Sequence, residues 1–526
     1  MNNNNNRVLE DTTTRTKGID ALNSNIEATK AVAQIIKTTL GPMGMDKMLI
    51  DNLGDTIITN DGVKILKEME INHPGAQMLV EVAKTQESEV GDGTTTAVIL
   101  SGEMLSNAQE LFRKKIHPTL IIKGYKKASQ KSLEILKENS MEINIENEKV
   151  IRDICETAMT GKVAEQAKET LSKIIYDITK YVKEKNYIPK DSIKIHKLTG
   201  GDTSDSFVLN GLAVDKKLIN PNMPTIKKQG KILLIDFPLE VRELDTDAKI
   251  SINTSQDYQI FLQQEHDYLK ELAYKIKEIG VDLVICQKGI DDSVAYYLAK
   301  SNIMAIRRTR KSDMNKLSKA LCKPIINSID DLTKNNLGNA QNIEVKEILD
   351  EHYLFIEGLK NPKATTLFLK ASTKYILDEI ERATQDAIGD INVLLKSKRI
   401  VAGGGAIEIE LYKELVKYSK TLEGKEQLIV EYFANSFLSI PKTLCENSGF
   451  DEIETIAKLI SNHEKNKKKS GLDGFIGVVD DTIKNKIIEP IDVKSQAIKS
   501  ATEITSMILR IDDIIAAEKL NKNGNI

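Results

Sequence analysis

Apolar residues recur every three to four positions over long stretches near both ends of the chain, a spacing typical of amphipathic helices. The helices expected in the first 145 residues cover 26–40, 63–69, 75–88, 95–112 and 119–139. Pro42 ends the first of them, and the alternation over 51–61 around Gly54-Asp55 predicts a hairpin. Helical periodicity returns from Ile407, and we expect it to continue through a last helix over 496–517.

The middle of the chain has a different pattern. From 231 to 371, short runs rich in β-branched residues alternate with helical or turn-rich pieces, which favours an α/β domain. The strands expected there are 232–237, 281–286, 303–307, 324–329, 353–357 and 365–369. Because this segment interrupts two helical ones, we expect the two ends of the chain to pack together as one discontinuous domain.

Composition narrows the class of protein. The 526 residues are enough for two to four domains, and the formal net charge of −3 gives no reason to expect a nucleic-acid partner. No apolar run reaches the ~18 residues that a membrane span needs, and the asparagine tract at 2–6 is unlike a signal peptide. We therefore expect a cytoplasmic protein without a membrane partner. Its cysteines lack metal-site spacing and are expected to be free and buried: Cys155, Cys286, Cys322 and Cys445.

One glycine- and threonine-rich run opens directly into a helical pattern. It comprises Gly91, Asp92, Gly93, Thr94, Thr95 and Thr96. The two glycines let backbone N–H groups approach an anion closely, and the start of the following helix favours negative charge. A carboxylate at Asp92 would repel phosphate unless it held Mg²⁺, which binds one or two carboxylates while bridging phosphates. The run therefore predicts a site for a nucleoside triphosphate and Mg²⁺, although the chain lacks the G-x-x-x-x-G-K-S/T motif of P-loop proteins.

A second acidic feature lies on the amphipathic helix expected over 374–396. Asp386 lies beside its apolar stripe, within one turn of Arg382, and Asp390 follows one turn later on nearly the same face. Hydrolysis of a bound nucleoside triphosphate would require a group that orients and deprotonates a water molecule. Periodicity does not decide which of the two carboxylates would do this.

Seven motifs follow one another along the chain. They are Leu40-Gly41-Pro42-Met43-Gly44-Met45-Asp46-Lys47, Thr59-Asn60-Asp61-Gly62, Gly91-Asp92-Gly93-Thr94-Thr95-Thr96, Thr160-Gly161-Lys162, Gln287-Lys288-Gly289-Ile290-Asp291-Asp292, Val401-Ala402-Gly403-Gly404-Gly405 and Gln496-Ala497-Ile498-Lys499-Ser500-Ala501-Thr502-Glu503. In this order, they resemble the motifs of the group II chaperonins, the family of the archaeal thermosome and the eukaryotic cytosolic chaperonin ring. The resemblance covers nearly the whole chain and is strongest to archaeal thermosome subunits.

The resemblance implies the multidomain chaperonin fold, in which an α/β apical domain is inserted into an α-helical equatorial domain through a small α+β intermediate domain. The equatorial, ATP-binding domain would cover 1–145 and 404–526, and the intermediate hinge domain 146–214 and 368–403. The apical, client-binding domain would cover 215–367 and carry a helical protrusion at about 245–275, the family's built-in lid. Within it, a helix is expected over 256–279, with Ser255 as its N-cap.

The resemblance also implies roles for single residues. Asp386 would be the base for the attacking water, Asp61 a second acidic residue near the γ-phosphate, and Lys162 the lysine that senses this phosphate. The family usually has an apolar residue at position 390, so Asp390 is a departure; it could perturb the pKa of Asp386 by like-charge repulsion or point away. Further implied nucleotide contacts are Leu40, Gly41, Pro42, Asn60, Gly161, Gly404, Glu489 and Lys494, the last two to the nucleoside.

The implied function is that of an ATP-dependent chaperone, which encloses unfolded protein in a double ring closed by a lid and driven by hydrolysis of Mg-ATP, with K⁺ as a further candidate ion. Its partners would be identical or homologous subunits in two stacked rings of eight or nine, unfolded clients and a prefoldin-type co-chaperone. A non-hydrolysing holdase or structural ring is the main alternative, and the three aspartates Asp61, Asp92 and Asp386 argue against it. A small-molecule kinase would need a second polar pocket, for which the sequence has no candidate.

Overall fold

The computed structural model describes residues 13–50, 54, 56–184, 186–241, 255–349 and 351–517. Its contacts divide the chain into two compact units, one of Met1–Ser172 with Asp378–Ile526 and one of Lys173–Leu377. Both ends of the chain therefore belong to one unit, as the two helical regions predicted. The finer division into three domains stays a prediction. Within the described ranges, no helix combines the length and the apolar character needed to cross a membrane.

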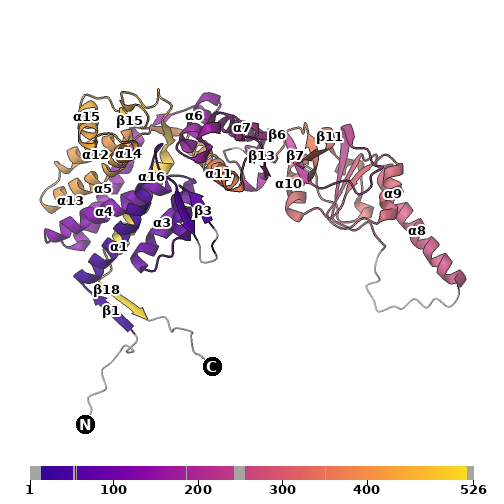
Figure 1. The fold of residues 1–526 in the computed structure, drawn as a ribbon, viewed down its shortest axis with the longest axis horizontal. Helices are drawn as coiled ribbons and strands as arrows, with labels where there is room; N and C mark the ends of the chain where they lie inside the picture. Colours follow the sequence, from indigo (N-terminus) through magenta and orange to yellow (C-terminus); the bar gives the residue numbers. More distant parts are fainter. Residues whose placement is uncertain are drawn as a thin grey trace, which may run out of the picture. The chain divides into compact units, whose positions relative to one another are not determined.

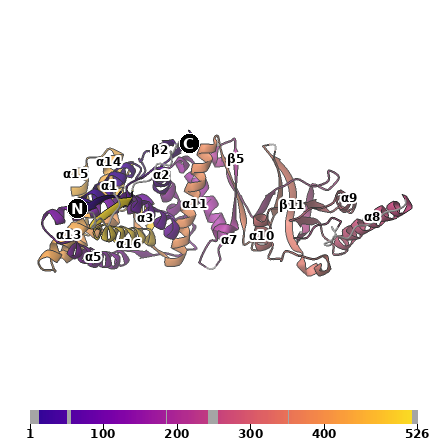
Figure 2. The same cartoon turned by 90° about the horizontal axis from the view of Figure 1, so that it is seen from below.

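The first unit is built around two helices from opposite ends of the chain, α4 (Thr94–Arg113) and α16 (Ile491–Ile508). Both pack against α3 (Pro74–Val90) and α5 (Pro118–Glu138), and α1 (Ile19–Lys37) lies along α4 (Figures 1 and 2). Their apolar faces form one buried core, as expected for helices with an apolar stripe. The other helices of this unit are α2 (Gly62–Glu68), α6 (Glu148–Met159), α12 (Ala406–Ser419), α13 (Lys425–Ser436), α14 (Ser439–Ser448) and α15 (Glu452–Glu464).

Short strands tie distant segments of this unit together. The strand β1 (Thr13–Lys17) pairs with β18 (Asp513–Ala517), near the two ends of the chain (Figure 1). The remaining pairings are β2 (Lys47–Ile50) with β3 (Thr56–Thr59), β15 (Gly471–Asp473) with β16 (Gly477–Val479), and β14 (Arg399–Ala402) between β17 (Ile488–Pro490) and β4 (Met141–Glu142). The prediction of a helix up to Ala517 is wrong, because α16 ends at Ile508 and the chain continues into β18. The predicted hairpin exists, but its first strand precedes the range assigned to it.

The second unit contains a six-stranded sheet of order β10-β9-β8-β11-β12-β7 and a three-stranded sheet of order β5-β13-β6. Their strands are β5 (Ile193–Thr199), β6 (Phe207–Leu209), β7 (Gly211–Asp215), β8 (Ile226–Ile235), β9 (Leu283–Cys286), β10 (Met304–Ile306), β11 (Gly338–Ile348), β12 (Glu351–Glu357) and β13 (Thr365–Ala371). Strands β8, β9 and β10 are parallel, and apolar cores cover both faces of the larger sheet, as parallel strands require. The α/β character predicted for the middle of the chain is therefore confirmed.

Three helices accompany these sheets: α8 (Ser255–Glu278), α9 (Asp292–Lys300) and α10 (Lys311–Leu321). In α8, which Figure 1 shows running out past α9, the buried side chains lie only in the C-terminal half, from Leu269 to Ile276. Three exposed apolar side chains, Tyr258, Ile260 and Leu262, lie in its N-terminal half, and Tyr274 is exposed in the C-terminal half. The predicted helix over 256–279 is thus confirmed, whereas the part of the expected protrusion before Ser255 lies outside the described residues.

Two helices connect regions assigned to both units: α7 (Lys168–Val182) and α11 (Lys374–Ser397), the latter confirming the helix predicted over 374–396. Short 3-10 turns lie at Val163–Ala167, Lys190–Ser192, Thr203–Asp205, Ile329–Asp331 and Lys334–Asn336. Two predictions for the second unit are wrong. The segment 324–329 is not a strand, since only Ile326 makes an isolated bridge to Ile235. Cys322 is exposed, because it terminates α10 in a left-handed conformation at the surface, whereas Cys155, Cys286 and Cys445 are buried and free.

Candidate nucleotide site

A cavity of about 410 Å³ lies within the first unit, between turns and helix ends from segments that are far apart in the chain. Its volume is in the range of pockets that bind small molecules, about 300–1,000 Å³. Every residue predicted as a site residue lines it: Leu40, Gly41, Pro42, Asn60, Asp61, Gly91, Asp92, Gly93, Thr94, Thr95, Thr96, Gly161, Lys162, Asp386, Gly404, Glu489 and Lys494. The structure thus brings all of them together, and their separate roles stay predictions.

The turn between α3 and α4 forms one wall of this cavity. Gly91 and Gly93 have φ of 85° and 77°, a left-handed conformation that glycine adopts without strain. Gly93 caps α4 without a side-chain hydrogen bond, so the first-turn N–H groups of this 20-residue helix are open to a ligand. A helix N-terminus of this kind attracts anions. Buried Gln86 fixes the turn, since its Nε2 donates to the carbonyl oxygens of Asp92 (2.9 Å) and Val493 (3.1 Å).

Close contacts also join the cavity segments that carry Gly41, Asn60 and Gly161. A Cβ added at Gly161, where φ is 79°, would lie 2.6 Å from the carbonyl oxygen of Gly41, so only glycine fits here. The Nδ2 of Asn60 donates to the Gly161 carbonyl at 3.0 Å, and the Nδ2 of Asn447 donates to the Leu40 carbonyl at 2.8 Å. The Oδ1 of Asn60 is buried without a partner among the described residues and is therefore available to a ligand.

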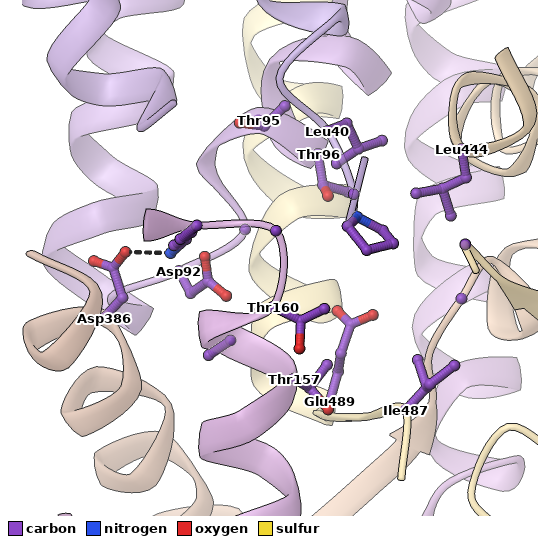
Figure 3. Close-up of a pocket in the computed structure, with 18 of the residues that line it drawn as sticks. Leu40, Asp92, Thr95, Thr96, Thr157, Thr160, Asp386, Leu444, Ile487 and Glu489 are labelled. Carbon is purple, nitrogen blue, oxygen red and sulfur yellow. Dashed lines mark hydrogen bonds and ion pairs between the residues drawn. The ribbon is translucent and has the colours of Figure 1, made fainter. Parts of the chain in front are cut away.

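The most strongly perturbed ionisable groups meet at Asp386. Its Oδ2 lies 2.6 Å from the Nζ of Lys162 (Figure 3). Burial raises the pKa of Asp386 to about 7; Lys162 opposes this shift, and the negative charges of Asp92 and Asp61 add to it. Burial lowers the pKa of Lys162, but Asp386 and Asp92 outweigh burial and hold it above its usual value. Asp386 can therefore gain and lose a proton near neutral pH, which is the property required of a general base.

Two more aspartates lie in the same cavity. Asp61 is the N-cap of α2 and accepts a hydrogen bond from the backbone N–H of Val63 at 3.0 Å; burial raises its pKa. Asp390 also lines the cavity, so the alternative that it points away is wrong. Burial raises the pKa of Asp390 well above its usual value, and the charges of Asp92 and Asp386 raise it further.

An ion triad supports the side of the cavity formed by β17. The Nζ of Lys494 lies 2.8 Å from Glu408 and 2.8 Å from Glu489, and the lysine is only 6% exposed. Burial lowers the pKa of Lys494, but these two carboxylates outweigh it and raise the pKa. Lys494 therefore holds Glu489 in place at the cavity. Glu408 was not predicted, because a single glutamate in the first turn of α12 has no distinguishing sequence pattern.

Apolar side chains form the wall opposite the aspartates. Figure 3 shows Leu40, Leu444 and Ile487 on one side of the pocket and Asp386 and Asp92 on the other. Apolar lining with a few polar groups is typical of small-molecule sites. Leu444 and Ile487 were not predicted, since they come from segments without a recognisable motif.

The polar groups fit a magnesium–nucleotide complex better than a metal held by protein alone. In the described part of the chain, no three His, Cys, Asp or Glu side chains are grouped so as to hold a metal ion. Mg²⁺ usually keeps several waters and takes one or two carboxylates together with substrate phosphates. Asp92, beside the anion-binding start of α4, meets that requirement.

Comparison with known proteins agrees with the family suggested by the motifs. The model of the TCP-1/cpn60 chaperonin family matches residues 32–519. A thermosome subunit of Pyrococcus horikoshii is 48% identical over 519 residues, which cover 98% of this chain and 94% of the relative. A thermosome subunit of Methanopyrus kandleri and the thermosome subunit alpha of Archaeoglobus fulgidus are each 46% identical over 519 residues, covering 98% of this chain and 95% of each relative. The chain therefore belongs to the TCP-1/cpn60 chaperonin family.

Proposed function

We propose that this chain is an ATP-hydrolysing chaperonin subunit and that the cavity in its first unit is the nucleotide site. The observation that carries the proposal is the pairing of Asp386 with Lys162 in a cavity that also contains the uncapped start of α4. A base that titrates near neutral pH and an anion-binding helix end are two of the elements that hydrolysis of a phosphoanhydride needs. A protein that only bound nucleotide would need the second element alone.

Each polar group then has a defined task. The N–H groups and hydroxyls of Thr94, Thr95 and Thr96 bind phosphate oxygens, and Asp92 holds Mg²⁺, which neutralises phosphate charge when bound. Asp386 accepts the proton of the attacking water, and Asp61 helps to orient that water. Lys162, which pairs with Asp386, also senses the γ-phosphate.

The remaining walls recognise the nucleoside. Glu489, which Lys494 holds in place, offers a carboxylate to the ribose hydroxyls, and the wall of Leu40, Leu444 and Ile487 receives the base. The backbone at Gly404 and around Gly41-Pro42 completes the pocket. K⁺ is a further ion that this phosphate-binding region would admit.

The name shared by the relatives, thermosome subunit, places them within a larger assembly, and this chain likewise assembles with other subunits. We propose two stacked rings of identical or homologous subunits with equatorial (1–145, 404–526), intermediate (146–214, 368–403) and apical (215–367) domains. Unfolded clients would bind the apical domain, where Tyr258, Ile260 and Leu262 expose apolar surface on α8. We further propose a cytoplasmic location and delivery of clients by a prefoldin-type co-chaperone.

A refolding assay separates this function from that of a passive holdase. A chemically unfolded enzyme is diluted into the purified assembly, and recovery of its activity is followed with ATP, with ADP and with the Asp386→Ala variant. We expect recovery only for the parent with ATP, because release of the client requires hydrolysis. Equal recovery with ADP or with Asp386→Ala would show that the protein holds clients without an ATP-driven cycle.

A further inference from the structure

Asp390 is a buried carboxylate with no role in the mechanism above. It is 3% exposed, lines the nucleotide cavity, and its Oδ1 has no hydrogen-bond partner among the described residues. A buried polar atom left without a partner costs free energy, typically about 1–3 kcal/mol. Such an atom in a ligand cavity points to a partner that belongs to the ligand.

The backbone explains why this carboxylate lies beside the proposed magnesium ligand. An added Cβ at Gly389 would lie 2.9 Å from the Cα of Gly91, and one at Gly91 would lie 2.8 Å from the Cα of Gly389. Helix α11 therefore touches the turn that carries Asp92, at a contact between two glycines. Asp390 follows directly in α11, with Asp386 one turn before it.

Most of the charges around Asp390 are negative, so its ionised form needs a positive partner. Asp92, Asp386 and Glu489 act on it as negative neighbours, and Lys162 is the positive one. Lys162 already lies 2.6 Å from Asp386, and a nucleotide brings more negative charge into the cavity. An ionised Asp390 is therefore compatible with bound nucleotide only if a cation lies nearby.

A second orphaned oxygen supports a hydrated ligand in this cavity. The Oδ1 of Asn60, 7% exposed, also lines the cavity without a partner among the described residues. Mg²⁺ keeps several of its waters when it binds through one or two carboxylates. Such waters are hydrogen-bond donors, and these two oxygens are acceptors.

We propose that Asp390 is a second acidic residue of the magnesium site, accepting hydrogen bonds from the waters that the ion retains while Asp92 binds the ion directly. The proposal rests on the nucleotide site proposed above and adds a residue to it. Hydrogen-bond partners of this kind typically raise metal affinity about 10–100-fold. The apolar residue that the chaperonin family usually has at this position could not accept such a hydrogen bond.

Manganese binding tests the proposal directly. Mn²⁺ is titrated into the assembled protein with saturating ADP, and free Mn²⁺ is counted by electron paramagnetic resonance. We expect Asp390→Val to weaken Mn²⁺ binding by about 10-fold or more, and Asp390→Asn, which keeps an acceptor without the charge, to weaken it less. The matched control is Glu381→Gln, which removes the same charge from α11 outside the cavity and should bind Mn²⁺ like the parent.

A thermal melt without nucleotide provides the second measurement. Asp390→Val should melt at a higher temperature than the parent, because it removes a buried carboxylate whose Oδ1 has no hydrogen-bond partner among the described residues. Weaker Mn²⁺ binding together with a higher melting temperature would show that Asp390 serves the ion and not the stability of the fold. If Asp390 had a structural role, its substitution would lower the melting temperature. Parent-like Mn²⁺ affinity in both Asp390 variants would overturn the proposal. If the parent itself does not bind Mn²⁺ and ADP, or Asp92→Ala binds as the parent does, the proposed nucleotide site fails instead.

Discussion

Removal of the Lys162 ammonium should shift the pH dependence of ATP hydrolysis upward. Asp386 can act as a base only when it is ionised, so kcat/KM of the parent should rise with pH and level off above the pKa of about 7. The Nζ of Lys162, 2.6 Å from Oδ2, stabilises the ionised form. In Lys162→Met, the carboxylates of Asp92 and Asp61 remain and burial is unchanged, so the pKa of Asp386 must rise.

The size of the shift follows from the geometry. An opposite charge within about 4–6 Å lowers a carboxyl pKa by about 1–3 units, and each unit corresponds to about 1.4 kcal/mol. At 2.6 Å, Lys162 lies well within that distance. We therefore expect the acid limb of kcat/KM to move from near pH 7 to about 1–3 units higher in Lys162→Met.

The assay is kcat/KM for ATP hydrolysis at saturating Mg²⁺ across about pH 5 to pH 10, because kcat/KM reports groups of the free enzyme. Lys162 is also proposed to contact the γ-phosphate, so the plateau will fall as well; the position of the limb is the informative quantity. Lys168→Met, which removes a lysine that lines the same cavity but does not pair with Asp386, should leave the limb in place. A Lys162→Met profile that is lower at every pH, with its limb unmoved or moved downward, would refute the reasoning.

Three further substitutions test the supporting structure. Lys494→Met should lower the free energy of unfolding by about 3–5 kcal/mol, because buried Glu408 and half-buried Glu489 lose their shared ammonium; an unchanged urea midpoint would contradict the triad. Gly389→Ala should cost about 1–3 kcal/mol and weaken ADP binding in calorimetry, since its Cβ would lie 2.9 Å from Gly91; a stabilised variant, as expected for an ordinary helix glycine, would show that the contact is not tight. His463→Phe should lower the melting temperature, because it breaks buried 2.8 Å contacts to Glu410 and Ser470; a parent-like melt would argue against them.

Local periodicity predicted the elements whose stability comes from one continuous apolar face. The helix over 374–396 was found almost to the residue, because its stripe repeats through the whole of α11. The last strand was missed, because β18 exists only through pairing with β1 at the other end of the chain. The segment 324–329 is rich in β-branched residues, yet only Ile326 pairs with a neighbouring strand. Propensity alone therefore predicted a strand where the structure has a single bridge.

The site was predictable where its chemistry is local and unpredictable where it depends on distant neighbours. Glycines that need a left-handed backbone beside a helix start, such as Gly91 and Gly93, leave a pattern in the sequence itself. Gln86 and Glu408 leave none, since the role of each depends on a contact to a segment far along the chain. The position of Asp390 depends likewise on the contact between Gly389 and Gly91, which joins helix α11 to a turn that the sequence does not relate to it.

The most direct test of the account is ATP hydrolysis by the purified assembly, compared between the parent and Asp386→Ala with nucleotide occupancy and particle mass recorded in the same samples. The account predicts that both proteins assemble and bind ATP, and that turnover by the variant falls by about 10²–10⁴-fold, the usual contribution of a general base. Turnover that survives in Asp386→Ala at equal occupancy would contradict the central claim and place the base elsewhere in the cavity, at Asp61 or Asp390. A parent assembly that binds ATP without hydrolysing it would contradict the claim of an ATPase altogether.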